Sequence, residues 1–449
     1  MRETPTLVLR FADLGIATYA SLRVVGQPWR TVTWVITEPI LLAAIEELAA
    51  AVPDPQGAET RVDAIERALT RGGFADQAGE LTLAYILGVL LISPEGWHLL
   101  GACLADPRAV LFVAPSARLA AVPWGLLAVP TSGPTAQELL QARAEAITSR
   151  GTVAARIPWQ LVDVTAHTDG FRLIELLDVL LAVPANITNM PRPQQDWADR
   201  RDGPVLLLLD PRVPGQRPDS ELGSVLGRPS ADGRLTRHLA ELGSRKVLVP
   251  HTGAAVELFR RSDADRHWLA RQLGDNPSRL LFVGHTSAAE GDLGSADRAA
   301  LHLACAATVP GLAEPVGAHR PLSAADIRAM ALRLPPRVAL LACSSGGDYR
   351  FDEATGLVAA MVLGGAQLVT ATLWSLPTTA GFHRFAADTT ADPMVEVIIA
   401  VDEAHDSIDA VGALNRWQRE RMRRWRDGDA AASPLYWAAV VTFCVDGAR

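Results

Sequence analysis

The chain has little lysine and cysteine, and both shortages exclude whole classes of chemistry. Lys246 is its single lysine, and every other basic residue is an arginine. No Gly-x-x-x-x-Gly-Lys phosphate-binding loop can therefore be written, and a Schiff-base lysine could only be Lys246. The four cysteines lie far apart, without a Cys-x-x-Cys pair, at Cys103, Cys305, Cys343 and Cys444. Such spacing excludes a disulfide scaffold or a zinc ribbon and is typical of a reducing cytoplasm.

Positive charge, metal-ligand patterns and long apolar runs are also missing. The net charge of -8 argues against direct binding of nucleic acid by phosphate neutralisation. The longest apolar run, residues 81–92, is too short to span a bilayer and predicts a buried helix. No histidine spacing resembles a metal site, so we expect no metal and no cofactor. Charged residues directly after Met1 predict that a signal peptide is absent, and we expect a cytoplasmic protein without a membrane segment.

What is present is enough apolar sequence for several cores. The chain has 449 residues, 49% of them hydrophobic, which predicts two or three domains. We expect a small α+β region at 1–93, a second region at 94–240 and a third at 241–449. In the third region strands alternate with helices, which predicts a mostly parallel sheet covered by helices on both faces.

The local patterns predict individual elements along the chain. Predicted strands lie at residues 6–10, 16–20, 30–36, 108–113, 204–211, 246–250, 280–284, 300–303, 335–342, 367–373 and 437–444. Predicted helices lie at residues 38–51, 61–70, 76–91, 135–147, 171–181, 263–273, 323–332 and 353–363, from residue 382, and at 406–427. Two stretches rich in Pro, Gly, Asp and Arg, residues 189–203 and 211–232, predict surface loops.

Cys343 directly follows the apolar strand at 335–342. A buried cysteine at a strand end is usually a small core residue. Here Ser344 and the residues up to Gly347 form a small-residue loop, which predicts an accessible thiol and offers backbone N–H groups for an oxyanion hole. Cys343 is therefore a candidate nucleophile.

His285 follows the strand at 280–284 in the same way, between Gly284 and Thr286. Because the carboxyl ends of parallel strands are where α/β proteins gather functional groups, we expect His285 and Cys343 to meet. A thiolate nucleophile needs such an imidazole beside it. The histidine precedes the cysteine by 343 − 285 = 58 residues, similar to the gap of about 50 in caspases. No third member of the catalytic site can be assigned from the sequence.

Ordered motifs around both residues resemble those of CHAT-domain proteins, in an actinobacterial-type variant. They are Gly-His-Thr-Ser at 284–287, Ala-Leu-His-Leu-Ala at 300–304, Pro-Leu-Ser-Ala at 321–324, Leu-Ala-Cys-Ser-Ser-Gly-Gly-Asp at 341–348, Val-Thr-Ala-Thr-Leu-Trp at 369–374 and Ser-Pro-Leu-Tyr-Trp-Ala-Ala at 433–439. The resemblance covers about residue 94 to the C-terminus and is strongest over 280–374.

This resemblance implies a caspase-like cysteine endopeptidase of the clan that includes separase. The implied fold is a three-layer αβα structure with a silent half at 94–240 and a catalytic half at 241–449. His285 would be the base and Cys343 the nucleophile, and backbone groups at Gly284, Thr286 and Ser344 would shape the oxyanion site. Many relatives have glycine where this chain has Thr286.

Further residues near the two strand ends are candidates for substrate binding. Trp374 follows a strand and could line a pocket or belong to the core. Four carboxylates could bind a basic substrate side chain: Asp292, Asp348, Asp352 and Glu353. Glu353 could equally be a charge at a helix N-terminus.

The resemblance implies cleavage of a specific protein partner in a bacterial defence or regulated cell-death system. We expect control by a sensor or activator protein in trans, by oligomerisation or by the N-terminal region, and the oligomeric state stays open. Two alternatives remain. One is a catalytically silent CHAT-fold scaffold or interaction protein. The other is an acyl hydrolase using Ser344 or Ser345, for which no Gly-x-Ser-x-Gly motif is present.

Overall fold

The computed structural model of the chain describes residues 4–104, 108–150, 156–159, 161–217, 222–287, 296–342, 351–386, 388, 390–445 and 447–448. Contacts within the chain divide it into two compact units. The first unit is Met1–Leu181 with Asn415–Ala438, and the second is Ala182–Leu414 with Ala439–Arg449. These limits differ from the regions 1–93, 94–240 and 241–449, and that division stays a prediction.

The first unit is built on a mixed sheet with the strand order β3-β2-β1-β4-β5. β1 and β3 run antiparallel to β2, whereas β4 runs parallel to β1 and to β5. Along β1 buried Leu7, Leu9 and Phe11 alternate with more exposed residues, as a strand with one core face requires. The bounds are β1 Thr6–Asp13, β2 Ala17–Val24, β3 Gln27–Thr37, β4 Val110–Ala114 and β5 Asp178–Ala182.

Helices complete the first unit and include the predicted buried helix, now α3. They are α1 Glu38–Ala49, α2 Arg61–Thr70, α3 Gln77–Leu91, α4 Pro94–Gly101, α5 Ala136–Arg150, α6 Leu161–Thr165, α7 Leu173–Leu176, the Asn415–Arg426 part of α16 (Ala410–Arg426) and α17 Pro434–Trp437. No described helix is by itself long and apolar enough to cross a bilayer, and α3 and α4 pass that test only as a pair bent by 106°.

The helix predicted at 171–181 is wrong. Only α7 is helical there, and the chain then becomes β5, which pairs in parallel with β4. The apolar run at 179–182 suits a helix or a strand equally well by its composition. Hydrogen bonding to the edge of β4, which local sequence does not report, decides for the strand.

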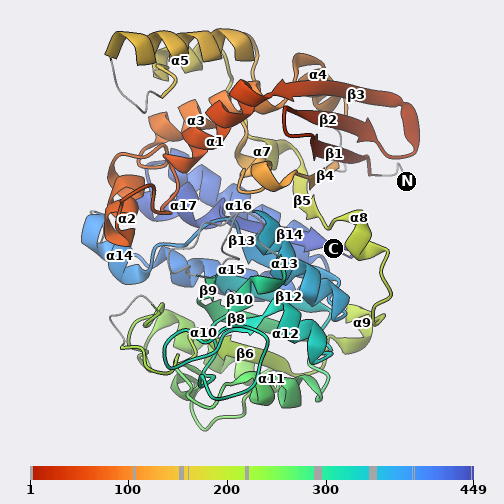
Figure 1. Ribbon diagram of the computed structural model, residues 1–449, viewed down its shortest axis with the longest axis vertical. Coiled ribbons are helices and arrows are strands. Elements are labelled where there is room, and N and C mark those ends of the chain that lie inside the picture. Colours follow the sequence, from red (N-terminus) through yellow and green to blue (C-terminus); the bar gives the residue numbers. More distant parts are fainter. Residues whose placement is uncertain are drawn as a thin grey trace. The chain divides into compact units, whose positions relative to one another are not determined.

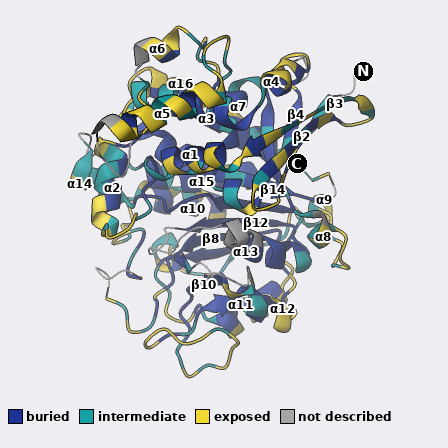
Figure 2. Cartoon of the chain, turned by 45° about the horizontal axis from the view of Figure 1, so that its top comes forward, coloured by how far each residue is buried: buried dark blue, intermediate teal, exposed yellow. Residues whose placement is uncertain are grey.

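The second unit contains a mostly parallel sheet with the order β14-β13-β12-β8-β6-β7 (Figure 1). All neighbouring pairs are parallel except the antiparallel β13 and β14. The strands are β6 Val205–Leu209, β7 Leu248–Val249, β8 Arg279–Gly284, β12 Arg337–Ala342, β13 Leu368–Thr372 and β14 Val440–Cys444. β8 and β12 are buried along their whole length, dark blue in Figure 2, which agrees with the predicted α/β class.

Helices cover both faces of this sheet. The connection from β6 to β7 crosses the sheet in one direction, and the connections from β7 through β8 and β12 to β13 cross it in the other. Right-handed crossovers in opposite directions place their helices on opposite faces. Contacts agree, because α10 packs against α15 whereas α13 packs against α12. The helices are α8 Ala185–Thr188, α9 Trp197–Arg200, α10 Arg234–Gly243, α11 Arg266–Leu273, α12 Ala324–Ala329, α13 Phe351–Leu363, α14 Thr379–Phe385, α15 Pro393–Asp406 and the start of α16.

The helix predicted at 406–427 is in fact α16, and α15 precedes it. The two are separated at Ser407, whose extended backbone ends α15. α15 was not predicted, although two local signals mark its start: Asp392 caps Val395 N, and Pro393 occupies the first turn. The helix predicted at 323–332 is α12, and it begins with a reciprocal capping box between Ser323 and Asp326.

A second, small antiparallel sheet has the order β11-β10-β9. Its strands are β9 Thr286–Ser287, β10 Ala300–Leu301 and β11 Leu322–Ser323. β9 begins two residues after β8 ends, so this sheet continues the chain from the large sheet. It therefore fixes the backbone on the far side of His285.

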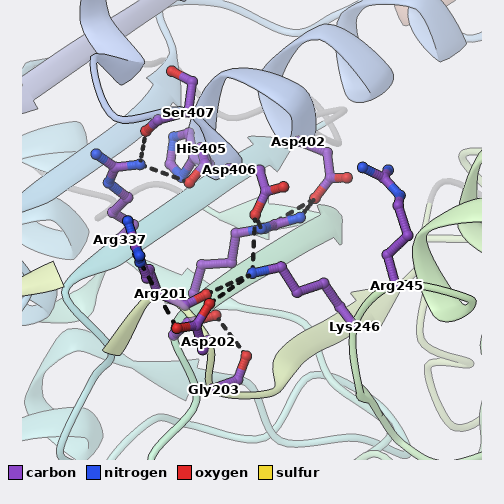
Figure 3. A network of polar contacts seen from close by, with 12 residues as sticks. Arg201, Asp202, Gly203, Arg245, Lys246, Arg337, Asp402, His405, Asp406 and Ser407 are labelled. Carbon is purple, nitrogen blue, oxygen red and sulfur yellow. Dashed lines mark hydrogen bonds and ion pairs between the residues drawn. The ribbon is translucent and has the colours of Figure 1, made fainter. Parts of the chain in front are cut away.

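Buried charges fix α15 to the amino edge of the large sheet (Figure 3). Arg279, the first residue of β8, donates to Asp402 at 3.0 Å and to Asp406 at 2.6 Å. Arg337, the first residue of β12, donates to the carbonyl of Ser407 at 2.5 Å. Arg279 and Asp402 are each 2% exposed at their side chains, so water screens this pair little. The network holds the sheet and α15 in one register.

The variant Asp402→Ala tests this network. Arg279 would stay buried without its main counter-charge, and we expect the free energy of unfolding to fall by about 3–5 kcal/mol, measured by urea denaturation. Asp297→Ala is the control, because Asp297 and Arg328 form an exposed pair and its loss should change the free energy by less than about 1 kcal/mol. Equal losses in both variants would contradict the assigned role.

Candidate active site

The carboxyl ends of β8 and β12 lie at the same level of the sheet. The two strands pair in parallel with Gly284 opposite Ala342. His285 follows Gly284 directly, and Cys343 follows Ala342 directly in the sequence. The register therefore ends both strands together, immediately before the two residues predicted to be catalytic.

Several predicted site residues lie outside the described part of the chain. These are Cys343, Ser344, Asp348 and Asp292. Asp352 and Glu353 belong to α13, but their side chains are not described. The predicted contact between His285 and Cys343 and the predicted acidic pocket therefore stay predictions.

The same edge is the topological switch point of the sheet. β6 lies between β7 and β8, so the connections after β6 and after β7 cross in opposite directions. In open α/β sheets ligands bind outside the carboxyl ends of the strands at such a point. Asp210 follows β6 and His285 follows β8, and Asp210 N donates to Val283 O at 2.6 Å. His285 thus lies where this architecture favours a binding site.

The ring of His285 is held by a backbone carbonyl. His285 is 4% exposed, and its Nε2 lies 3.0 Å from the carbonyl oxygen of Gly223. Since a carbonyl only accepts, Nε2 carries the proton, and in the neutral ring Nδ1 is the basic nitrogen. Gly223 is the orienting group that sequence reasoning could not assign. No sequence signal reports it, because every residue has a carbonyl.

A pair of buried histidines lies behind His285. His302 N donates to His285 O at 3.0 Å, and His302 Nδ1 lies 2.9 Å from His319 Nε2. Within the described chain, the outer nitrogens of the pair, His302 Nε2 and His319 Nδ1, are buried without a hydrogen-bond partner. Burial, followed by the charges of His319 and His285, lowers the pKa of His302 to about 3, and burial lowers that of His319. At neutral pH both rings therefore favour the neutral form.

Three other predicted residues are described. A Cβ at Gly284 would lie 2.8 Å from the Phe282 ring and 3.4 Å from Pro211, so glycine allows close packing at this strand end. Thr286 is buried in β9 opposite Leu301, and its part in an oxyanion site stays a prediction. Trp374 is fully buried, which favours its interpretation as a core residue. Its part in substrate binding also stays a prediction.

No group of three His, Cys, Asp or Glu side chains within the described ranges has a metal-binding arrangement. A cavity of about 600 Å³ lies in the first unit, lined by β3, the α3–α4 corner and residues 129–136. None of the residues predicted for the active site lines it. The strand ends at His285 therefore remain the candidate site.

Comparisons with known proteins agree with the sequence motifs. A family model described as CHAT domain matches residues 87–444. A search of curated proteins finds no match. Among solved structures the chain is similar to one in the crystal structure of the Saccharomyces cerevisiae separase–securin complex, with 11% identity, a TM-score of 0.41 and 98% of this chain covered. The chain spans 30% of the length of that chain.

The packing at Gly284 predicts the effect of Gly284→Ala. Because the added methyl group must displace the Phe282 ring, we expect the free energy of unfolding to fall by about 1–3 kcal/mol. A thermal or urea transition measures the change. The control is Gly101→Ala, since a Cβ there meets no atom within 4 Å. A Gly284→Ala protein as stable as the control would contradict the tight packing.

The neutral histidine pair predicts how stability depends on pH. The pKa of His302 is about 3 in the folded chain and about 6.5 when unfolded, so the unfolded state binds more protons between these values. The burial of neutral His302 therefore costs no free energy of unfolding above about pH 6.5. Below that pH the free energy of unfolding falls steadily as the pH approaches 3. In urea titrations across this window, His302→Asn should reduce the slope of unfolding free energy against pH. An unchanged slope would show that His302 is not buried in its neutral form.

Proposed function

The chain belongs to the CHAT-domain family, and from this premise we propose that it is a cysteine endopeptidase with His285 and Cys343 as its catalytic dyad. The observation that supports the dyad most strongly is the pairing of Gly284 with Ala342. It ends two neighbouring parallel strands together, one residue before each member of the dyad. A second support is the hydrogen bond from His285 Nε2 to the Gly223 carbonyl, which leaves Nδ1 as the basic nitrogen of the neutral ring.

The chemistry then follows from the two groups. Nδ1 of His285 takes the thiol proton, and the Cys343 thiolate attacks the carbonyl carbon of the scissile bond. The carbon–nitrogen bond breaks as His285 returns the proton to the leaving amine, which leaves an acyl-enzyme thioester. His285 next removes a proton from water, the hydroxide attacks the thioester, and the carbon–sulfur bond breaks as His285 returns that proton to the sulfur. The products are an amine, a carboxylic acid and the free thiol.

We further propose a protein substrate, control by a separate sensor or activator protein, and a role in bacterial defence or regulated cell death. These proposals rest on the family resemblance. A cytoplasmic location is proposed from cysteine usage, since the four cysteines lie far apart in the sequence without a Cys-x-x-Cys pair. The silent half at 94–240 is part of the same proposal.

A catalytically silent scaffold is the second candidate. It is favoured by Thr286, which stands where many relatives have glycine and lies in β9 opposite Leu301. A backbone group engaged in strand pairing is less available to a tetrahedral oxyanion. The scaffold would bind the same kind of protein partner without cutting it.

Cleavage assays separate the two candidates. Products of neighbouring genes are incubated with the full chain, and fragments are identified by mass spectrometry. Cys343→Ala and His285→Gln should each reduce the cleavage rate at least about 1,000-fold, because each removes a reacting group. Cys305→Ala is the matched control, since Cys305 is a buried cysteine that does not follow β8 or β12 in the sequence, and the cleavage rate of this variant should stay unchanged.

Two outcomes would contradict the peptidase. Cleavage by Cys343→Ala at the wild-type rate would exclude this nucleophile. A wild-type chain that binds a partner stably and leaves it intact would instead support the scaffold.

A further inference from the structure

A buried carboxylate stands at the strand end next to His285. Asp210 follows β6, is 1% exposed, and has a positive φ of 52°. Non-glycine residues adopt this left-handed conformation infrequently, although Asp and Asn tolerate it best. This conformation turns the chain sharply directly after the end of β6. An aspartate that is both buried and left-handed needs a specific set of partners.

Those partners belong to one turn of the chain and one arginine. Ser224 Oγ lies 2.6 Å from Asp210 Oδ2, and the amides of Val225 and Leu226 donate to the carboxylate at 3.2 and 3.4 Å. The Arg260 guanidinium lies 3.3 Å from Oδ1 and balances the charge. Asp210 therefore fixes three consecutive residues, 224–226, by direct contact.

The turn held in this way begins at the residue that orients His285. The Gly223 carbonyl and the Ser224 amide belong to the same planar peptide group. Contacts of Asp210 with Ser224 and Val225 consequently fix the direction of the Gly223 carbonyl. That carbonyl accepts from His285 Nε2 at 3.0 Å. One continuous chain of contacts thus joins the carboxylate to the imidazole.

The charge state of Asp210 follows from competing effects. Burial raises the pKa of Asp210 above its usual value, and the Ser224 hydroxyl, the Arg260 charge and the two turn amides oppose this rise without cancelling it. Every one of these opposing groups stabilises the ionised carboxylate. The arrangement suits an acceptor that must hold several donors at once.

We propose that Asp210 is a positioning residue for His285, acting through the 223–226 turn, so that the ring keeps its proton on Nε2 and its base on Nδ1. For the reaction itself this inference rests on the proposed peptidase function. Asp210 touches neither substrate nor the reacting atoms in this scheme. It sets the tautomer and the direction of the ring, as outer-shell carboxylates do for other functional histidines.

The chain offers a closely matched control at Asp326. That carboxylate is also buried, accepts from two consecutive amides, Leu312 and Ala313, and contacts the Ser323 hydroxyl and the Arg266 guanidinium. Asp326 holds the 312–313 loop and the start of α12, whereas Asp210 holds Ser224, the residue after Gly223. Asp326→Asn therefore removes the same chemistry from the fold and leaves the contacts between Asp210 and the 223–226 turn in place.

The test is the tautomer of His285, read by long-range proton–nitrogen correlation in full chain labelled with [15N]histidine. The chain has 10 histidines, and His285→Gln identifies the resonances of the site. Asp210→Asn keeps a residue that tolerates positive φ but replaces one acceptor oxygen with a donor. We expect Nε2–H in the wild type and a tautomer ratio shifted about fivefold or more in Asp210→Asn, the factor for about one hydrogen bond.

Asp326→Asn should lower the melting temperature and leave the His285 tautomer unchanged. An unchanged tautomer in Asp210→Asn, or an equal shift in both variants, would overturn the proposal. If Asp210→Asn does not fold, Ser224→Ala removes one contact with Asp210 and leaves the charge pair in place. It should shift the ratio in the same direction, and no shift would again overturn the proposal.

The kinetic arm distinguishes this proposal from the proposed function. With a cleavable partner, Asp210→Asn should lower kcat about 10–100-fold and change KM less than about threefold, while Asp326→Asn leaves kcat within about threefold. If the wild-type chain cleaves nothing but Asp210→Asn still shifts the tautomer, the proposed peptidase function is contradicted. The positioning role of Asp210 is then still supported. Normal kcat in Asp210→Asn would overturn that role.

Discussion

The parallel register of β6, β8 and β12 is the constraint on which the candidate site depends. Leu209 pairs with Val283, and Gly284 pairs with Ala342, so the three strands end within one or two residues of each other. Side chains alternate along a strand, and a slip of one residue would turn every following side chain to the opposite face. Asp210 and His285 stay neighbours at this edge because the hydrogen bonds of the sheet allow no other alignment.

Polar groups are buried at both the amino and the carboxyl ends of these strands, and the two groups stabilise different parts of the structure. At the amino edge Arg279 and Asp402 fix α15 to the first residues of the strands. At the carboxyl edge Asp210 fixes a turn, and the turn fixes a histidine ring. Between the two edges, the residues of β8 and β12 are buried along the whole strand. The free energy gained by burying their apolar side chains offsets the cost of removing both polar networks from water.

Much of the framework was predictable because it rests on local signals. Apolar runs marked β8 and β12, and Ser323 with Asp326 marked the start of α12. At 171–181 the composition suits a helix and a strand equally, so the local signal gave the wrong element. Pairing with β4 made residues 178–182 a strand. α15 was not predicted, although Asp392 and Pro393 mark its start. The helix predicted from residue 406 begins only at Ala410, because Ser407 has an extended backbone.

The sequence by itself determined the α/β class, the family motifs and the choice of His285 as a candidate base, because each depends on residue types in order along the chain. The tertiary structure decided which group orients that base. Gly223 lies 62 residues before His285 and acts through a carbonyl that every residue possesses. Asp210 acts one step further away, through the turn that presents this carbonyl. Neither has a sequence pattern, because both roles are created by strand ends and a loop that meet only after folding.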